Sequence, residues 1–193
     1  PSGLLCLIFV SSLHHEDQVR VRENLEAAEE LRLVAGARSL IGDVEMIAGD
    51  IRLMASLPSL ARALDKGDAP SLAAFTADLV ALSASRRLYD QLRWIDESGM
   101  ERVRVDYVQN QPFVVPVERL QNKAQRYFFV DTMNLAPGEI YVSPFDLNIE
   151  QGRVETPFKP TLRLGMPVVD RAGRPRGIVM VNYFGRFLLD KFS

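Results

Sequence analysis

The chain has 193 residues, of which 47% are hydrophobic and 8% aromatic, so it can bury one sizeable core, and a disordered protein is excluded. Its formal net charge is -2 and its pI is near 5.8, with lysines and arginines interspersed among acids. Because no basic stripe is present, nucleic acid is not expected as a partner. The single cysteine, Cys6, cannot form an intramolecular disulfide, and no Cys/His grouping has zinc-ligand spacing. We therefore expect no metal and no cofactor.

The N-terminal residues 1–13 contain the apolar run "GLLCLIFVSSL". This run is shorter than the roughly 20 residues that a helix needs to cross a bilayer. One interpretation is a truncated transmembrane segment, with the polar "HHEDQVR" marking the entry into water. The alternative is a turn of a buried N-terminal helix. No small-residue cleavage site follows directly, as it would after a signal peptide, and we favour the truncated transmembrane segment.

A long helix is predicted from His15 to about Leu57. One stripe at steps of three and four carries the pattern: Leu33, Ala37, Leu40, Val44, Ile47, Ile51 and Met54. Such a helix would be roughly 60 Å long. Gly36, Gly42 and Gly49 interrupt it, and they indicate either close approach of a neighbouring backbone or plain tolerance.

Two shorter helices complete the predicted helical half, residues 14–87. Pro58 is expected to restart the helix and Gly67 to end the piece that follows. Asp68 is a candidate N-cap for the next helix, which has Pro70 in its first turn.

The second half, residues 88–193, is predicted to form a sheet of about five strands. "LYDQLRWIDESGMERVRVDY" indicates a hairpin that turns at 97–99. "VERLQNKAQRYFF" is predicted as a short helix, and the strands "EIYVS", "TLRLGMPVVD" and "RGIVMVNYF" follow it. Because no crossover helix separates the last strands, the sheet should be antiparallel. The fold class is therefore α+β, with helices against a PAS-like sheet.

Several strings together resemble a known family: "YDxxRWIDxxGxExVRV", "LQNKAQRYFF", "YVSPFDLNIEQG", "PFKPTLRLGMPV" and "GxxxGIVMVNY". Over residues 14–190 the chain is similar to the membrane-distal module of a Cache (PDC, PAS-like) extracytoplasmic sensor domain. The resemblance implies a periplasmic domain held in the bacterial inner membrane by flanking transmembrane helices. It also implies a histidine kinase of a two-component system, a diguanylate cyclase or a chemoreceptor, of which this chain would be a fragment.

The resemblance further implies a small-molecule pocket on one face of the sheet, below the short helix. Amino-acid-binding members carry an Arg-x-Trp-Tyr string in this roof, which has "RYFF" as its counterpart here. They carry an Asp at the end of the last strand, where this chain has Asn182. Because an amide supplies no charge to a buried ammonium, an α-amino acid becomes a doubtful ligand.

We therefore expect an anionic or neutral polar ligand, such as an organic acid or another polar metabolite. The predicted binding residues are Arg126, Phe128, Phe129, Tyr141, Ser143, Asp146, Arg163 and Asn182.

Each candidate has an alternative role. Arg126 could pair with Asp131 or Asp146, Arg163 could face solvent, and the aromatic residues could belong to the core. Asp146 and Asn148 could cap the turn after Pro144.

No catalytic motif is present. The two histidines, His14 and His15, are adjacent, the serines lack a histidine partner in any motif, and there is no Gly-rich phosphate loop. The competing function is a structural module that dimerises through the long helix and has no ligand of its own. In the sensor interpretation, a ligand would shift that helix against its mate in a homodimer.

Overall fold

The computed structural model describes residues 2–150 and 153–191, which divide into two compact units. Residues 43–190 form the larger unit, and residues 2–42 with Lys191 belong to the smaller one. α1 (Ser2–Ser56) contributes to both units and begins earlier than the predicted helix. Within the described residues, no helix has the length and apolar character that crossing a membrane would require. The assignment of residues 1–13 to a transmembrane segment stays a prediction, and Pro1 lies outside the described residues.

The helical hairpin after α1 confirms the predicted breaks. α2 (Pro58–Lys66) begins with its proline and ends at Gly67, which adopts the left-handed conformation that glycine tolerates. α3 (Ala69–Arg86) is capped by Asp68, whose side chain accepts a hydrogen bond from the backbone N–H of Ser71. α2 and α3 pack against each other.

One antiparallel sheet of seven strands forms the second half, in the order β3-β2-β1-β9-β8-β4 with β5 also paired to β8. Its strands are β1 (Tyr89–Ile95), β2 (Glu101–Val108), β3 (Gln111–Val114), β4 (Tyr141–Val142), β5 (Asp146–Leu147), β8 (Pro160–Val169) and β9 (Pro175–Phe184). β6 (Ile149–Glu150) and β7 (Arg153–Val154) form a separate two-stranded hairpin. The α+β fold class is confirmed. The strands beyond the predicted five are β3 and β5, short pieces at the sheet's margins, and Pro112 in β3 fits an edge strand because proline has no N–H to donate.

The predicted short helix over 117–129 is displaced in the structure. A 3-10 turn, η1 (Val117–Arg119), is followed by an irregular stretch, and α4 (Tyr127–Met133) begins only at the aromatic residues. Within that stretch Asn122 forms a β-bridge with Met100, and the backbone N–H of Lys123 bonds the carbonyl of Gly99. These backbone bonds tie the stretch to the β1–β2 turn and leave it unavailable for a helix.

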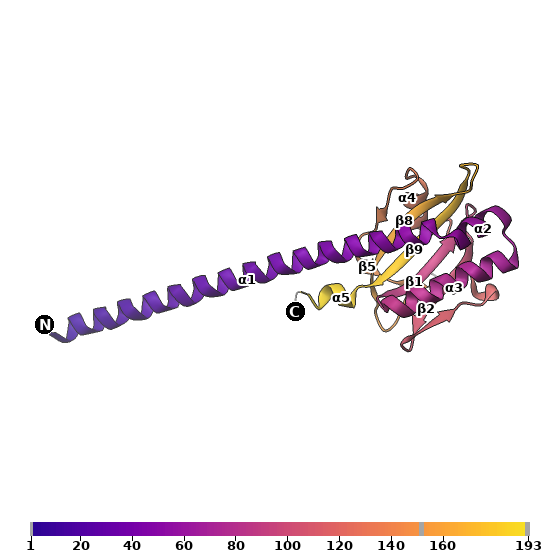
Figure 1. Ribbon diagram of the computed structural model, residues 1–193. Helices are drawn as coiled ribbons and strands as arrows, with labels where there is room; N and C mark the ends of the chain where they lie inside the picture. The colour runs from indigo at the N-terminus through magenta and orange to yellow at the C-terminus, as the bar shows by residue number, and fades with distance from the viewer. Residues whose placement is uncertain (1, 151–152, 192–193) are drawn as a thin grey trace. The chain divides into compact units, whose positions relative to one another are not determined.

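Different helices cover the two faces of the sheet. α3 packs along β1, β2 and β3, and Figure 1 shows it beside β1 and β2. The C-terminal turns of α1 bring Ile47, Ile51 and Met54 into the core. The sheet face that belongs to this core is apolar and includes Val179 and Val181 of β9. α4 packs on the opposite face, against β4, β8 and β9. The part of the opposite face that α4 leaves uncovered is available for a binding site.

Asp50 links three elements of the larger unit at the helical face. Its carboxylate is almost fully buried and accepts two hydrogen bonds from Arg86 of α3, both 2.7 Å long. It also accepts a hydrogen bond from the Tyr89 hydroxyl at the start of β1. Burial and this acidic partner both raise the pKa of Tyr89, which stays protonated. One carboxylate thus joins α1, α3 and β1.

We predict that Asp50→Asn lowers the free energy of unfolding by about 2–3 kcal/mol, because charge-assisted hydrogen bonds lose a partner inside the core. Urea unfolding monitored by circular dichroism measures this change. Glu45→Gln, an exposed position on the same helix, is the control and should change stability by less than about 0.5 kcal/mol. Equal effects of the two substitutions would contradict the role of Asp50.

Candidate functional site

Polar side chains follow the strands on the face of the sheet opposite α3. The register pairs Gln91 of β1 with Asn182 of β9, and Asn182 in turn with Arg163 of β8. Because side chains alternate along a strand, Arg93 lies on the same face as Gln91. All four of these residues are buried. Charged groups in such a place need partners.

Arg93 is the centre of the first polar network and only 2% of its surface is exposed. Its guanidinium donates to the Asn182 side-chain oxygen at 2.7 Å and to the Glu101 carboxylate at 3.3 Å. The Asn182 amide donates to Gln91 Oε1 at 3.0 Å. Asn182 is therefore held by protein groups on both sides, and the network runs from the sheet centre to Gln91.

Arg163 is the centre of the second network and is 1% exposed, so it does not face solvent. Its guanidinium is ion-paired with Asp146 of β5. It also donates to the Tyr127 hydroxyl at 3.3 Å and to Asn148 Oδ1 at 3.1 Å. The side chain of Asn148 thus holds Arg163, and the expectation that it caps the turn after Pro144 is wrong.

The predicted aromatic residues belong to an apolar cluster between α4, which carries Phe128 and Phe129, and the sheet. Phe128 and Phe129 are buried there together with Ile95, Ile178 and Met180, and Tyr141 packs against the cluster. The guanidinium carbons of Arg93, Arg126 and Arg163 lie 5.4–5.5 Å from the centroid of the Phe128 ring. Within the described residues no ion pair joins Arg126 to Asp131 or Asp146. This part of the face is filled by side chains.

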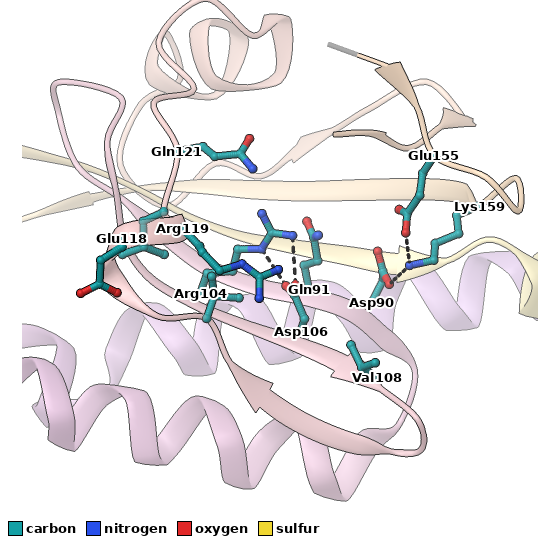
Figure 2. Close-up of a pocket in the computed structure, with 12 residues that line it drawn as sticks. Asp90, Gln91, Arg104, Asp106, Val108, Glu118, Arg119, Gln121, Glu155 and Lys159 are labelled. Carbon is teal, nitrogen blue, oxygen red and sulfur yellow. Dashed lines mark hydrogen bonds and ion pairs between the residues drawn. The ribbon is translucent and has the colours of Figure 1, made fainter. Parts of the chain in front are cut away.

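A cleft of about 540 Å³ opens beside the filled part, between β1, β2, η1 and the start of β8 (Figure 2). Most of its lining is polar or charged: Asp90, Gln91, Arg104, Asp106, Val108, Val115, Glu118, Arg119, Leu120, Gln121, Glu155 and Lys159. Arg104 holds Asp106 by two hydrogen bonds of 2.7 and 3.0 Å. The volume is within the range of small-molecule pockets.

Both polar networks end in this cleft. The first reaches it through Gln91. The second continues from Asn148, whose amide donates to Glu155 at 3.0 Å. Glu155 pairs with Lys159 at 2.6 Å, and Lys159 in turn lies 3.4 Å from Asp90. A molecule in the cleft would therefore contact groups that are connected to the buried arginines.

Asp90 is the most unusual group of the cleft. It is 3% exposed, and burial raises the pKa of its carboxyl, with Lys159 opposing the shift. Lys159 reaches only one of its oxygens, Oδ1. The other, Oδ2, is buried and has no hydrogen-bond partner within the described residues. Buried polar atoms without a partner are rare in folded proteins.

None of the eight residues predicted from the sequence lines the cleft. Arg163, Asn182 and Asp146 belong to the networks behind it, and Phe128, Phe129 and Tyr141 belong to or border the apolar cluster. The Ser143 hydroxyl is used within the backbone: it donates to the carbonyl of Pro144 and accepts from the N–H of Arg163. Their role in ligand binding stays a prediction.

Sequence reasoning missed Asp90, Gln91, Arg93, Glu155 and Lys159. A signal existed for the β1 residues, because "YDQLRWI" places polar Gln91 and Arg93 in alternation with Leu92 and Trp94. No comparable signal marked Glu155 and Lys159, which lie in an irregular segment after β7.

Comparison with known families identifies the domain. The model of the bacterial histidine kinase sensor domain family matches residues 44–192, more than half of the chain. The chain belongs to this family. The match confirms the expected type of domain, a non-catalytic sensor of the Cache-like class. A search of curated protein sequences gave no match.

Solved structures of sensor domains have the same fold as this sensor domain. The extracellular domain of the histidine kinase vpHK1S-Z8 superposes with a TM-score of 0.75 at 23% identity, covering 81% of this chain and 56% of that one. A domain of a sensory box/GGDEF family protein from Vibrio parahaemolyticus gives 0.74 at 22% identity, covering 79% and 57%. The sensory domain of the Campylobacter jejuni chemoreceptor Tlp3 with isoleucine bound gives 0.63 at 11% identity, covering 89% of this chain and 63% of that one. The chain thus spans somewhat over half of these chains.

Because the pKa of Asp90 is raised, we predict that the effect of Asp90→Asn on the free energy of unfolding depends on pH. In the folded state the Asp90 carboxyl keeps its proton to a higher pH than in the unfolded chain, where an aspartate has a pKa of about 3.9. The stability that this proton linkage contributes is therefore present at low pH and is lost as pH rises through the raised pKa.

Asn cannot ionise, so the free energy of unfolding of Asp90→Asn relative to the unsubstituted protein should increase between pH 4 and 7. Urea unfolding across this range measures the difference. A difference that is constant, or that decreases with pH, would contradict the buried, desolvated state of Asp90.

Proposed function

We propose that this sensor domain lies on the periplasmic side of the bacterial inner membrane, in a transmembrane signalling receptor, and binds a small polar molecule in the cleft. The supporting observation is the cleft itself, which has ligand size and convergent polar groups connected to both buried networks. Related structures support the same function, since the ligand-binding domain of Tlp3 is seen with isoleucine bound and in complex with L-norvaline.

The expectation of an anionic ligand rested on Arg126 and Arg163. Arg163 is already neutralised by Asp146 and does not line the cleft. The charge of the ligand must therefore be inferred from the residues that line the cleft.

A route from the cleft to α1 runs through β1. Asp90 lines the cleft, and its neighbour Tyr89 points to the other face of the sheet, where its hydroxyl bonds Asp50 of α1. The register of β1 against β9 shifts between Tyr89 and Gln91, so this part of the strand is irregular. Tyr183 of β9 makes a second bond to α1, donating to Asp43 at 2.7 Å. A ligand that prefers one arrangement of this strand end would thereby bias α1.

The exposed residues of α1 favour a second function, dimerisation. Leu31, Leu33, Val34 and Ile41 are exposed large apolar side chains, Leu33 to 62%. In a homodimer, the same helix of a second copy would cover them. This function is compatible with ligand sensing, because a dimeric helix pair can carry the shift of α1.

The test of ligand binding is a thermal-shift screen of the 193-residue chain against carboxylates, amino acids, amines, purines and pyrimidines. A ligand at a hundred times its Kd stabilises by about 2.7 kcal/mol, which is visible as a raised Tm. Val108→Trp should abolish the shift because Val108 lines the cleft. Val114→Trp, a similarly exposed valine of the neighbouring strand that does not line the cleft, should retain it. No shift from any class, or a shift unaffected by Val108→Trp, would contradict the proposal.

The test of signal transmission uses disulfide crosslinking between two copies of α1. In a Cys6→Ser background, single cysteines replace exposed residues of α1 such as Leu33 and Ile41. We predict that a saturating ligand changes which positions crosslink most rapidly, because the helices shift against each other. An identical pattern with and without the ligand would overturn this mechanism, and a lack of crosslinks at all positions would overturn the dimer.

A further inference from the structure

We infer that the ligand presents a protonated amine and that Asp90 binds it. The inference rests on the proposed function of the cleft as a ligand site and adds the chemical class of the ligand. It is carried by the arrangement of Asp90, Glu155 and Lys159 at the end of the cleft next to β8 (Figure 2).

The first argument is a local excess of negative charge. Asp90 and Glu155 share one ammonium group, that of Lys159, which lies 2.6 Å from Glu155 but 3.4 Å from Asp90. Lys159 is thus primarily the partner of Glu155, and the Asp90 carboxylate is incompletely neutralised. Over the whole lining the balance has the same sign, with four carboxylates against three cationic side chains. In a partly enclosed site, such an excess attracts a cation more strongly than it would in water.

The second argument concerns hydrogen bonding to Asp90. Oδ2 of Asp90 is a buried acceptor without a donor within the described residues. An ammonium group brings three N–H donors on one compact cation, so it can satisfy Oδ2 and offset the charge at once. A hydroxyl could donate one hydrogen bond but would leave the charge, and a carboxylate would add to the repulsion.

The position of Lys159 also allows a ligand to reach Asp90. Lys159 has a flexible stem and a side chain that is 35% exposed, and its stronger bond is to Glu155. By turning fully toward Glu155, Lys159 uncovers Asp90 and yields its place to the ammonium of the ligand. Each carboxylate then has its own cation.

The repulsion that Asp90 now experiences fits this interpretation. After burial, Asp106 and Glu155 are the contributions that raise the pKa of its carboxyl, and Lys159 is the one that lowers it most. A second cation beside Asp90 would relieve this repulsion, as any ion pair does.

The experiment uses three probes of equal length that share a hydroxyl at one end: 4-aminobutan-1-ol, butane-1,4-diol and 4-hydroxybutanoate. Their other ends are cationic, neutral and anionic. Binding to the 193-residue chain is measured by NMR titration at low salt. We expect 4-aminobutan-1-ol to bind at least tenfold more tightly than the diol, because charge-assisted hydrogen bonds replace a neutral one, and 4-hydroxybutanoate to bind more weakly than both.

Two substitutions with opposite expected effects test the residue assignment. Asp90→Asn should weaken the binding of 4-aminobutan-1-ol roughly 10- to 100-fold, the loss of a charge-assisted bond. Lys159→Met removes the competing ammonium and should strengthen it. Glu45→Gln changes the net charge by the same amount as Asp90→Asn, but at an exposed site outside the cleft, and should leave the binding of 4-aminobutan-1-ol unchanged.

The inference is overturned if 4-hydroxybutanoate binds better than the amine, if Asp90→Asn binds the amine as well as the unsubstituted chain, or if Lys159→Met weakens amine binding. It is also overturned if no probe binds. The proposed function fails separately, only if no compound class in the broad screen raises Tm in a way that depends on Val108.

Discussion

Two buried guanidinium groups constrain one whole face of this sheet. Arg93 on β1 and Arg163 on β8 lie on either side of the central strand β9, and both are almost completely removed from water. A buried charge costs several kcal/mol unless it is paired and hydrogen-bonded. Their partners come from distant parts of the chain: Glu101 of β2, Asn182 of β9, and Asp146 and Asn148 near β5. Satisfying two arginines thus positions the segments that border the cleft.

The same strand that carries Arg93 also connects the two faces. On the cleft side β1 presents Asp90, and on the helical side the neighbouring Tyr89 bonds Asp50 of α1. A sheet strand places successive side chains on opposite faces, so a displacement of this strand end would move side chains on both faces. The cleft on one face and the carboxylate of α1 on the other are therefore in contact with two adjacent residues of β1.

Much of the fold could be predicted from the sequence, because its signals are local. Pro58, Gly67 and Asp68 mark helix ends by backbone chemistry, and the alternating pattern of β2 indicates a strand without reference to the rest of the chain. The position of α4 could not be predicted, because backbone bonds to the β1–β2 turn prevent the preceding segment "VERLQNKAQ" from forming a helix. Such bonds depend on a neighbour that is distant in sequence.

The site was predictable only in part for the same reason. Asn182 was predicted because it stands where members of a known family carry an Asp, and Arg163 because a guanidinium on a strand can hold an anion. The structure places both on one face of the sheet, behind the cleft rather than in its lining. Asp90 and Lys159 lie 69 residues apart, and nothing in either local sequence indicates that they meet. The cleft is lined by segments from β1, β2, η1 and the start of β8, so its location follows from how these segments pack.

The most direct measurement is a methyl NMR spectrum of the chain during titration with a compound that raises its Tm. If the cleft is the ligand site, the methyl signals of Val108, Val115 and Leu120, which line it, will shift. Those of the exposed Val142 and Val154, which do not, will stay in place. Shifts confined to Val142 and Val154, with the cleft methyls unchanged, would contradict the account.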